Sequence, residues 1–206
     1  MIETLDQLDR DLMLWINYDG GAILDQWWWI VSGKFTWIPL YLYLIWCLVQ
    51  KCQPVKIRWK ELTALILLTI LVVVLSDQIS SGLIKPLVMR PRPARPDSGI
   101  SDMIHIVNGY RGGHYGFVSS HAANTWGIAL WFILLMKGNR QTSGNSSFLI
   151  PHFPLILILF VACNCYSRMY LGVHYPGDIL GGLLVGTAAA LLVYYVLLPL
   201  VNRWIK

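Results

Sequence analysis

Charged side chains are scarce in this sequence. Asp, Glu, Lys and Arg make up 13% of its 206 residues and 56% are hydrophobic, whereas a soluble domain carries about 25% charged residues. The scarcity excludes an ordinary soluble domain and indicates a membrane protein. The formal net charge of +5 does not indicate nucleic-acid binding, because the basic residues are divided between separate loops and form no continuous basic face.

Metal-site patterns and a cleaved leader are also lacking. The cysteines do not have the spacing of a zinc site, so apolar packing is their expected role; they are Cys47, Cys52, Cys163 and Cys165. Asp97 and Asp102 are too few and too loosely placed to form a magnesium site, and we expect no metal or other cofactor. The N-terminus lacks the basic segment and short apolar core of a signal peptide, so no cleavage is expected.

Long apolar runs dominate what is present. A hydrocarbon layer about 30 Å thick needs about 20 helical residues, and the last three of five charge-poor runs reach that length. The first two are shorter and can span with weakly polar residues at their ends. The runs cover residues 35–50, 62–76, 115–136, 141–167 and 179–202. They predict an all-α integral membrane protein with a bundle of five transmembrane helices.

The N-terminal segment has a different pattern. Hydrophobic residues recur at helical spacing among acidic ones, which predicts an amphipathic helix on the membrane surface; the former are Leu5, Leu8, Leu12 and Trp15. Three consecutive tryptophans, residues 27–29, continue this segment as an interfacial belt. The alternative is that residues 22–33 form a sixth span. We therefore divide the chain into an interfacial segment, residues 1–33, and a single transmembrane domain, residues 34–206.

Basic residues outside the apolar runs predict the orientation. The loop of residues 51–60, the loop near residue 140 and the C-terminus all carry lysine or arginine and fall on one side of a five-helix bundle. The positive-inside rule makes that side cytoplasmic. We therefore expect a multi-pass protein of the cytoplasmic (inner) membrane, with the remaining polar segments on the non-cytoplasmic face.

The first of these polar segments, KPLVMRPRPARPDSG, contains Lys85, Arg90, Arg92 and Arg95. Its four prolines remove backbone donors and fix φ, so the segment is predicted to be a stiff, irregular connector and not a helix continuing from the second span. A basic patch that touches anionic lipid headgroups is the simpler interpretation.

The second segment, GHYGFVSSHAAN, leads into an apolar helix. Ser119 or Ser120 is the expected N-cap, and a helix start offers backbone N–H groups and partial positive charge to an anion. His121 falls in the first turn, where a purely structural histidine is the alternative.

The third segment, SRMYLGVHYPGD, places His174 and Asp178 four residues apart around Pro176. Proline favours the first turn of a helix, so Asp178 is expected to open the last transmembrane helix. From there its carboxylate can reach back to one ring nitrogen of His174 and leave the other as a nucleophile. A helix-start aspartate beside an unrelated loop histidine is the plainer alternative.

Together the three segments suit a phosphate ester with a leaving group. Lys85, Arg92 and Arg168 can neutralise the non-bridging oxygens. One imidazole can attack phosphorus while the other protonates the departing oxygen.

This arrangement resembles the type 2 phosphatidic acid phosphatase (PAP2) family, whose pattern is K-x6-R-P, then P-S-G-H, then S-R-x5-H-x3-D. The first motif is matched by Lys85, Arg92 and Pro93, and the third motif is complete from Ser167 to Asp178. The middle motif reads VSSH, with Val118 and Ser120 in place of proline and glycine. Ser120 adds a side chain where glycine lets the backbone approach the phosphate, so it can clash or contribute a hydroxyl.

The resemblance implies a role for each matching residue. His174 is the nucleophile that forms a phosphohistidine, oriented by Asp178, and His121 is the general acid and later the base. The implied phosphate cradle consists of Lys85, Arg92, Ser119, Ser120 and Arg168. Arg90 is either a second phosphate contact or a lipid-facing charge. His105 and His114 match no motif position and are interpreted as loop residues, of which His114 is the one more expected to touch the substrate.

The resemblance further implies a metal-independent hydrolase that acts on a membrane lipid phosphate. Undecaprenyl pyrophosphate is the first expected substrate, with phosphatidylglycerol phosphate, phosphatidic acid and lipid A 1-phosphate as alternatives. A non-hydrolytic lipid-binding or lipid-moving protein and a phosphoryl transferase remain open as further alternatives. The expected partners are the lipid phosphate and the phospholipid bilayer, no nucleic acid is expected, and the oligomeric state stays open.

Overall fold

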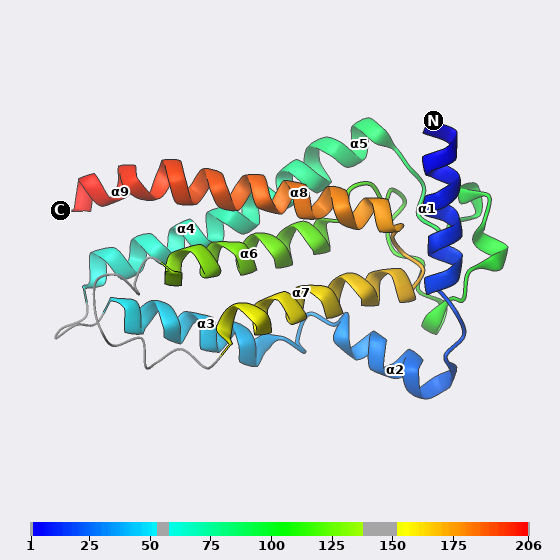
Figure 1. Cartoon of the computed structure of the whole chain (residues 1–206), viewed down its shortest axis with the longest axis horizontal. Coiled ribbons are helices and arrows are strands. Elements are labelled where there is room, and N and C mark those ends of the chain that lie inside the picture. Colours follow the sequence, from blue (N-terminus) through cyan, green and yellow to red (C-terminus); the bar gives the residue numbers. More distant parts are fainter. Residues whose placement is uncertain (1, 53–57, 138–151, 206) are drawn as a thin grey trace.

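The computed structural model describes residues 2–52, 58–137 and 152–205, and these form helices and loops without a strand (Figure 1). The α-helices are α1 (Ile2–Ile16), α2 (Gly21–Val31), α3 (Ile38–Lys51), α4 (Trp59–Asp77), α5 (Lys85–Val88), α6 (Ser120–Lys137), α7 (Phe153–Tyr170), α8 (Pro176–Leu192) and α9 (Leu198–Ile205). The π-helices η1 (Gln78–Ile84) and η6 (Val193–Leu197) join α4 to α5 and α8 to α9.

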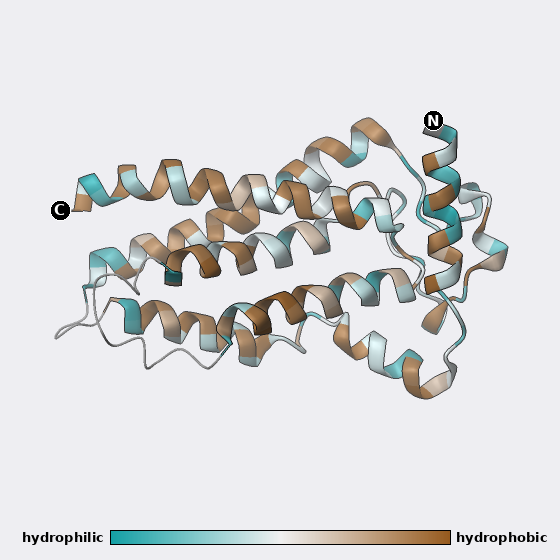
Figure 2. Ribbon diagram, in the orientation of Figure 1, coloured by the Kyte–Doolittle hydropathy of each residue, from teal (hydrophilic) through white to brown (hydrophobic). Residues whose placement is uncertain are grey.

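The long helices run side by side as a bundle, and α6 lies among α4, α7 and α8 (Figure 1). The buried core contains large side chains such as Trp131, Phe132 and Phe160. Many large hydrophobic side chains of the long helices stay exposed, such as Leu42, Leu67 and Leu184, and the ribbons of these helices are mostly brown in Figure 2. Three helical stretches are long and apolar enough to cross a membrane: Trp59–Val88, Phe153–Tyr170 and Pro176–Ile205. The predicted all-α membrane bundle is therefore confirmed.

The other two predicted spans correspond to α3 and α6. Helix α3 is apolar but has 14 residues. Helix α6 has 18 residues, and half of its positions are buried against neighbouring helices. Because those neighbours cover it, α6 needs less apolar surface than a lipid-exposed helix, and its polar first turn is accommodated inside the protein.

Small residues bring α6 and α8 into close contact. An added Cβ at Gly182 would lie 2.4 Å from the carbonyl oxygen of Ser119, and one at Gly186 would lie 2.4 Å from that of Ala123. Only glycine permits such an approach of two helix backbones. The backbone N–H of Ser119 also donates to the carbonyl oxygen of Asp178 at 2.9 Å. This packing fixes the start of α6 beside the start of α8.

The expectation that the second span ends before Lys85 is wrong. Helix α4 continues through η1 into α5, so Lys85 lies within one helical stretch, and the irregular connector begins after Val88, where Met89 has a φ of 50°. Proline normally disrupts a helix because it lacks an N–H and its ring meets the preceding turn. The wider π-helical turn in front of Pro86 accommodates both effects.

The N-terminal segment covers one end of the bundle. Helix α1 lies across that end, and α2 runs from it back toward α3 (Figure 1). Helix α2 has 11 residues, fewer than the about 20 that cross a hydrocarbon layer, and it is not among the described helices that are long and apolar enough to span a membrane. The alternative of a sixth span at residues 22–33 stays a prediction. The hydrophilic teal face of α1 in Figure 2 agrees with its acidic sequence.

The basic loops lie at the opposite end. The end of α3, the start of α4, the end of α6 and the C-terminus gather there (Figure 1). They carry Lys51, Arg58, Lys60, Lys137 and Arg203. The predicted loop near residue 140, and Lys56 in the loop of residues 51–60, lie outside the described residues.

Candidate active site

The candidate site is built from five segments at the end of the bundle that α1 lies across (Figure 1). They are the start of α5, the connector that follows it, the first turn of α6, the last turn of α7 and the segment entering α8. They position, in this order, Lys85, Arg92, the Ser119–His121 turn, Arg168, and the pair His174 and Asp178. The three polar segments of the sequence therefore converge on one end of the bundle.

His174 and Asp178 form a buried pair. Pro176 begins α8, and Asp178 lies in its first turn, as the sequence predicts. The Nδ1 of His174 is 3.3 Å from Oδ2 of Asp178, and the same oxygen accepts the backbone N–H of Tyr175 at 3.0 Å. The two residues are 2% and 0% exposed. With Nδ1 directed at the carboxylate, Nε2 is the ring nitrogen available for chemistry.

Positive charge surrounds His174. Burial lowers its pKa well below 6.5, and the nearby charges of Arg92, Arg168 and Lys85 lower it further. A charged imidazole is disfavoured both in a poorly solvated site and beside cations. His174 is therefore neutral near pH 7, which is the form in which a histidine acts as a nucleophile.

Arg168 reaches into the cluster from the last turn of α7. One terminal nitrogen donates to Ser32 Oγ at 2.5 Å and the other to Tyr110 Oη at 3.3 Å. Its Nε is buried and has no hydrogen-bond partner among the described residues. A buried guanidinium N–H without an acceptor is costly, and a phosphate oxygen is the kind of acceptor that arginine prefers.

Arg92 is buried by the loop that follows the connector. Its Nε donates to the carbonyl oxygen of Tyr115 at 3.0 Å, and Gly112 approaches so closely that an added Cβ would lie 2.4 Å from one terminal nitrogen. Burial lowers the pKa of Arg92 to about 10, and the charge of Arg168 adds to this effect. The guanidinium remains charged near pH 7 in spite of its burial.

Ser119, Ser120 and Lys85 complete the cradle. Ser119 caps α6, because its Oγ accepts the backbone N–H of Ala122 at 3.4 Å. Ser120 does not clash: its Oγ accepts a hydrogen bond from Lys85 Nζ at 3.0 Å. The Ser120 hydroxyl, at the position where the motif has glycine, therefore holds the Lys85 ammonium beside the N-terminus of α6.

His121 lies beside a cavity. Its ring is hydrogen-bonded to the backbone of Ser32, and it lines a space of about 400 Å³ together with Lys34, Trp37 and Asn124. His121 also lies within electrostatic reach of His174. The two imidazoles thus belong to one site, with His121 on the side that opens toward α2 and α3.

Arg90 faces away from the cradle. Its terminal nitrogens donate to Asp6 at 3.0 Å, Asp9 at 2.7 Å and Asp178 at 3.1 Å. Burial alone would lower the pKa of the guanidinium, but the carboxylates of Asp178 and Asp9 outweigh it and raise that pKa. Arg90 is therefore paired with carboxylates and is not a lipid-facing charge. A second phosphate contact at Arg90 stays a prediction.

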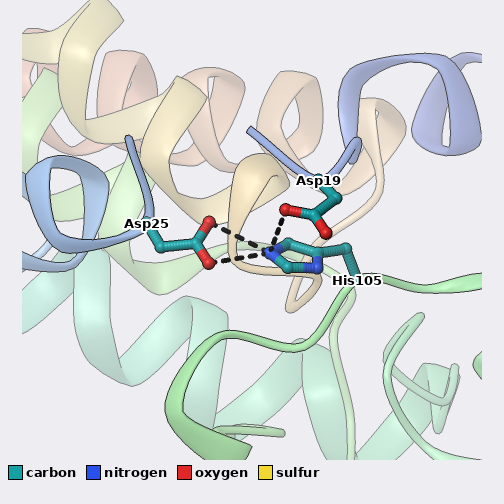
Figure 3. Close-up of side chains that lie close together, drawn as sticks. All are labelled: Asp19, Asp25 and His105. Carbon is teal, nitrogen blue, oxygen red and sulfur yellow. Dashed lines mark hydrogen bonds and ion pairs between the residues drawn. The ribbon is translucent and has the colours of Figure 1, made fainter. Parts of the chain in front are cut away.

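His105 and His114 lie in other pairs. His114 Nε2 is 3.1 Å from Asp97 Oδ2 at the surface. His105 Nε2 is 3.0 Å from both oxygens of Asp25 and 3.9 Å from Asp19 (Figure 3). Within the described ranges, this trio is the one group with metal-ligand spacing. Hydrogen bonds already account for it, since Asp25 Oδ1 also accepts Tyr170 Oη–H at 2.6 Å.

Charge and burial together define the chemistry of the site. Arg92 and Arg168 are 8% and 5% exposed, and the nearest carboxylate, Asp178, is already paired with Arg90. Buried cations need a compensating anion. The site therefore fits a small, multiply charged anion held beside a neutral histidine, as in a phosphate ester.

Comparison with known proteins agrees with this chemistry. The profile of the PAP2 superfamily matches residues 64–201, which include all eight residues of the cluster. The chain belongs to the PAP2 superfamily. It is a membrane-bound lipid phosphatase of this superfamily, a hydrolase of phosphoric monoesters.

Two curated PAP2 relatives match almost the whole chain. A lipid A 4'-phosphatase of Bacteroides thetaiotaomicron is 33% identical over 98% of this chain and 83% of its own length. A lipid A 4'-phosphatase of Porphyromonas gingivalis is 32% identical over 99% and 79%. Both matches include the N-terminal segment that lies outside the motifs.

Two crystal structures share the fold. LpxE from Aquifex aeolicus superposes with a TM-score of 0.62 at 22% identity, over 90% of this chain and 94% of that one. The transmembrane PAP2-type phosphatidylglycerolphosphate phosphatase of Bacillus subtilis gives 0.63 at 19% identity, over 92% and 84%.

Sequence reasoning missed several residues of this PAP2 site. Ser32 and Tyr110 hold Arg168 from segments with no recognisable motif. Asp9 reaches the site from α1. The one available signal was that Asp6 and Asp9 are three residues apart and so share a face of the amphipathic helix, while Arg90 had no motif role.

Proposed function

We propose that this PAP2 enzyme hydrolyses the phosphate monoester at the 4' position of the sugar headgroup of a lipid A-type glycolipid. Two curated relatives that cover nearly the whole chain at 33% and 32% identity are lipid A 4'-phosphatases, and this observation carries the choice of substrate. The cluster supports the chemistry, since it combines a neutral buried histidine with three cations.

The proposed reaction has two steps. His174 Nε2 attacks phosphorus, the bond from phosphorus to the sugar oxygen breaks, and His121 gives its proton to that oxygen. Asp178 holds Nδ1–H throughout and stabilises the charge that develops on the ring. Water then attacks the phosphohistidine, His121 takes up its proton, and inorganic phosphate leaves with His174 restored. No step needs an ion or a cofactor.

Each cradle residue has a proposed part in this sequence. Arg92 and Arg168 bind the non-bridging oxygens, which gain negative charge on the way to the transition state. Lys85 adds a third positive charge, and the Ser119–Ser120 turn adds backbone donors at the N-terminus of α6. The orphan Nε of Arg168 supports this assignment.

The cavity beside His121 is the proposed place of the leaving group. A general acid must lie within hydrogen-bond reach of the oxygen it protonates, so the sugar has to lie on the His121 side of the phosphate. Trp37 and Tyr41 offer aromatic faces there, and Lys34 and Asn124 offer polar groups. A lateral approach from the bilayer, between helices, suits a substrate with acyl chains.

We infer that the site opens on the non-cytoplasmic face of the inner membrane. The described basic residues of the predicted cytoplasmic loops lie at the end of the bundle opposite α1 and the cluster (Figure 1). The positive-inside rule then directs the cluster outward. Cysteine labelling of intact cells at an exposed residue near the site, such as Met103, tests this orientation.

Neither of the two curated relatives is named for undecaprenyl pyrophosphate, the first substrate expected from sequence. It belongs in the substrate panel with lipid A labelled at the 1 or the 4' phosphate, phosphatidylglycerol phosphate and phosphatidic acid. Purified protein in detergent is assayed for phosphate release with excess chelator. We expect release from the 4' position at a kcat/KM at least about tenfold above that of every other substrate. A higher value for any of the others overturns the choice of lipid A.

The mechanism is tested separately from the substrate. His174→Ala is expected to lose phosphate release from every lipid, whereas His114→Ala, a histidine paired with Asp97 at the surface, keeps it. A rapid acid quench of the wild-type protein should trap a phosphohistidine. Release by His174→Ala at the wild-type rate refutes the assignment. Labelled phosphate in a new lipid would identify a transferase, and binding without release a non-hydrolytic protein.

A further inference from the structure

Helix α1 is joined to the active site by charge. Asp6 Oδ1 accepts from one terminal nitrogen of Arg90 at 3.0 Å, and Asp9 Oδ2 accepts from the other at 2.7 Å. Both aspartates lie on the face of α1 that meets the connector after α5. These are long-range contacts between residues 81 and 84 positions apart in the sequence.

The same helix also contacts the start of α8. Asp9 Oδ1 accepts the backbone N–H of Gly177 at 2.7 Å. An added Cβ at Gly177 would lie 2.8 Å from Asp9 Oδ2, so α1 packs directly on the turn that precedes Asp178. Asp9 thus holds Arg90 with one oxygen and the α8 N-terminus with the other.

Arg90 links helix α1 to the carboxylate of Asp178. Its guanidinium lies 3.8 Å from the centre of the Tyr175 ring, which fixes its plane. One nitrogen donates to Asp178 Oδ1 at 3.1 Å, while Oδ2 is directed at His174 and the Tyr175 N–H. The two oxygens of Asp178 therefore have separate partners, and Arg90 holds the one that does not face the histidine.

We propose that Arg90 is a positioning residue of the phosphatase and that α1 belongs to the active site, because Asp9 holds Arg90 in place and Arg90 keeps Asp178 ionised and oriented toward His174. This inference rests on the proposed roles of His174 and Asp178 and goes beyond them. Arg90 touches no reacting atom. It acts through Asp178, which is fully buried and needs a counter-charge to stay ionised there.

The titratable and charged groups around Asp178 determine the expected pH effect. Those that face it from the packed elements are Asp9 on α1, Lys85 on α5, Arg90 and Arg92 on the connector, and His174 and Tyr175 before α8. Arg90 is the cation in direct contact. Removing it leaves Asp9 as a repelling neighbour, so Asp178 takes up a proton at higher pH and stops accepting from His174.

The test compares Arg90→Gln with Arg90→Lys and with a matched control. Arg10→Gln removes another arginine of the α1 contact, one that donates to the Ser98 carbonyl oxygen at 2.8 Å and does not reach Asp178. For Arg90→Gln we expect kcat to fall about 10- to 100-fold at nearly unchanged KM, with the acid limb of the pH profile moved to higher pH. Arg90→Lys keeps the positive charge and should return the acid limb of the pH profile to its wild-type position. Arg10→Gln should keep the wild-type profile.

A second pair of variants tests the connection to α1. Asp9→Asn keeps the acceptor for Gly177 and removes the charge opposite Arg90. Because both residues act on one carboxylate, Arg90→Gln with Asp9→Asn should be no slower than Arg90→Gln alone. If the double variant instead loses activity by the product of the two single losses, α1 acts independently of Arg90. That result would overturn the connection between α1 and Asp178. If Arg90→Gln does not fold, Arg90→Lys and Asp9→Asn give the same comparison.

The outcomes separate this inference from the proposed function. Arg90→Gln with a wild-type pH profile and kcat overturns the positioning role, even if His174→Ala is inactive. A rise in KM alone assigns Arg90 to substrate binding and also overturns it. Equal losses in Arg90→Gln and Arg10→Gln reduce the role to docking of α1. An active His174→Ala refutes the mechanism itself.

Discussion

Replacing Gly116 by alanine tests how closely catalysis depends on the position of the Asp178 carboxylate. Gly116 lies in the loop between the connector and α6, and its N–H donates to the carbonyl oxygen of Arg90 at 2.8 Å. Its φ lies outside the left-handed region, so alanine fits the backbone. The substitution therefore adds one methyl group at a defined place.

The size of the effect follows from the contact. The new Cβ would lie 2.7 Å from Asp178 Oδ2, whereas ordinary contacts begin at 3.4 Å, a shortfall of 0.7 Å. The carboxylate has to move by that amount or the loop has to yield. Because Oδ2 is 3.3 Å from His174 Nδ1, the shift lengthens this contact or turns the ring. Misplacement by about 1 Å can cost about 100-fold in rate, and we expect a fall in kcat of about 10- to 100-fold.

The assay is steady-state phosphate release by purified protein in detergent, with thermal unfolding followed in parallel. Gly113→Ala is the control, because its Cβ would meet Arg92 at an ordinary 3.5 Å in the same loop. We expect Gly116→Ala to lose kcat with KM nearly unchanged, and the control to stay within about twofold. A folded Gly116→Ala protein with wild-type kcat would refute the claim that Asp178 orients the nucleophile.

Further predictions concern packing, pH and metal. Gly186→Ala should lower the midpoint of thermal unfolding by several degrees, because its Cβ would lie 2.4 Å from a backbone oxygen of α6 and overpacking costs about 1–3 kcal/mol; an unchanged midpoint contradicts the close packing of α6 and α8. Burial and three nearby cations lower the pKa of His174 well below 6.5, so protonation of this proposed nucleophile should reduce kcat/KM only well below pH 6.5; a His174-dependent decline centred at 6.5 contradicts this. Burial opposes the ionisation of Asp25, yet hydrogen bonds from Tyr170 and His105 lower its pKa. A lowered carboxyl pKa stabilises the fold above the unfolded-state pKa, so Asp25→Asn should lower the unfolding midpoint at pH 7, and the difference should shrink as the pH falls through 3.8 and below; a difference independent of pH refutes the ionised pair. Excess chelator should leave phosphate release unchanged, and a loss restored by one added metal would contradict the metal-independent reaction.

The sequence was informative about the site because each motif lies at the end of an apolar helix. Helix ends of a membrane bundle meet at the same depth, so residues as far apart as Lys85 and His174 could be expected to lie together from the order of the motifs and apolar runs. The pair His174 and Asp178 was predictable for a local reason, since four residues around a helix-starting proline bring the two side chains together.

Other features depend on contacts that no local pattern encodes. Arg90 and Arg92 are two residues apart and chemically identical, yet one faces α1 and the other faces the cradle. Their difference depends on Asp6 and Asp9, more than 80 positions away in the chain. The continuation of α4 as far as Val88 was missed for another reason: a proline normally ends a helix, and the π-helical turn that accommodates Pro86 leaves no simple mark in the sequence.

The hydrogen bond between Lys85 and Ser120 has a consequence for the entropy of substrate capture. A lysine side chain loses about 1.5–2 kcal/mol of rotamer freedom when it becomes fixed. Where the motif has glycine, the lysine would lose this freedom only when it binds the phosphate. Here the serine hydroxyl fixes the ammonium 3.0 Å away in the folded protein, and two of its three donors remain for the ligand. The departure from the motif therefore gives this enzyme a preorganised lysine.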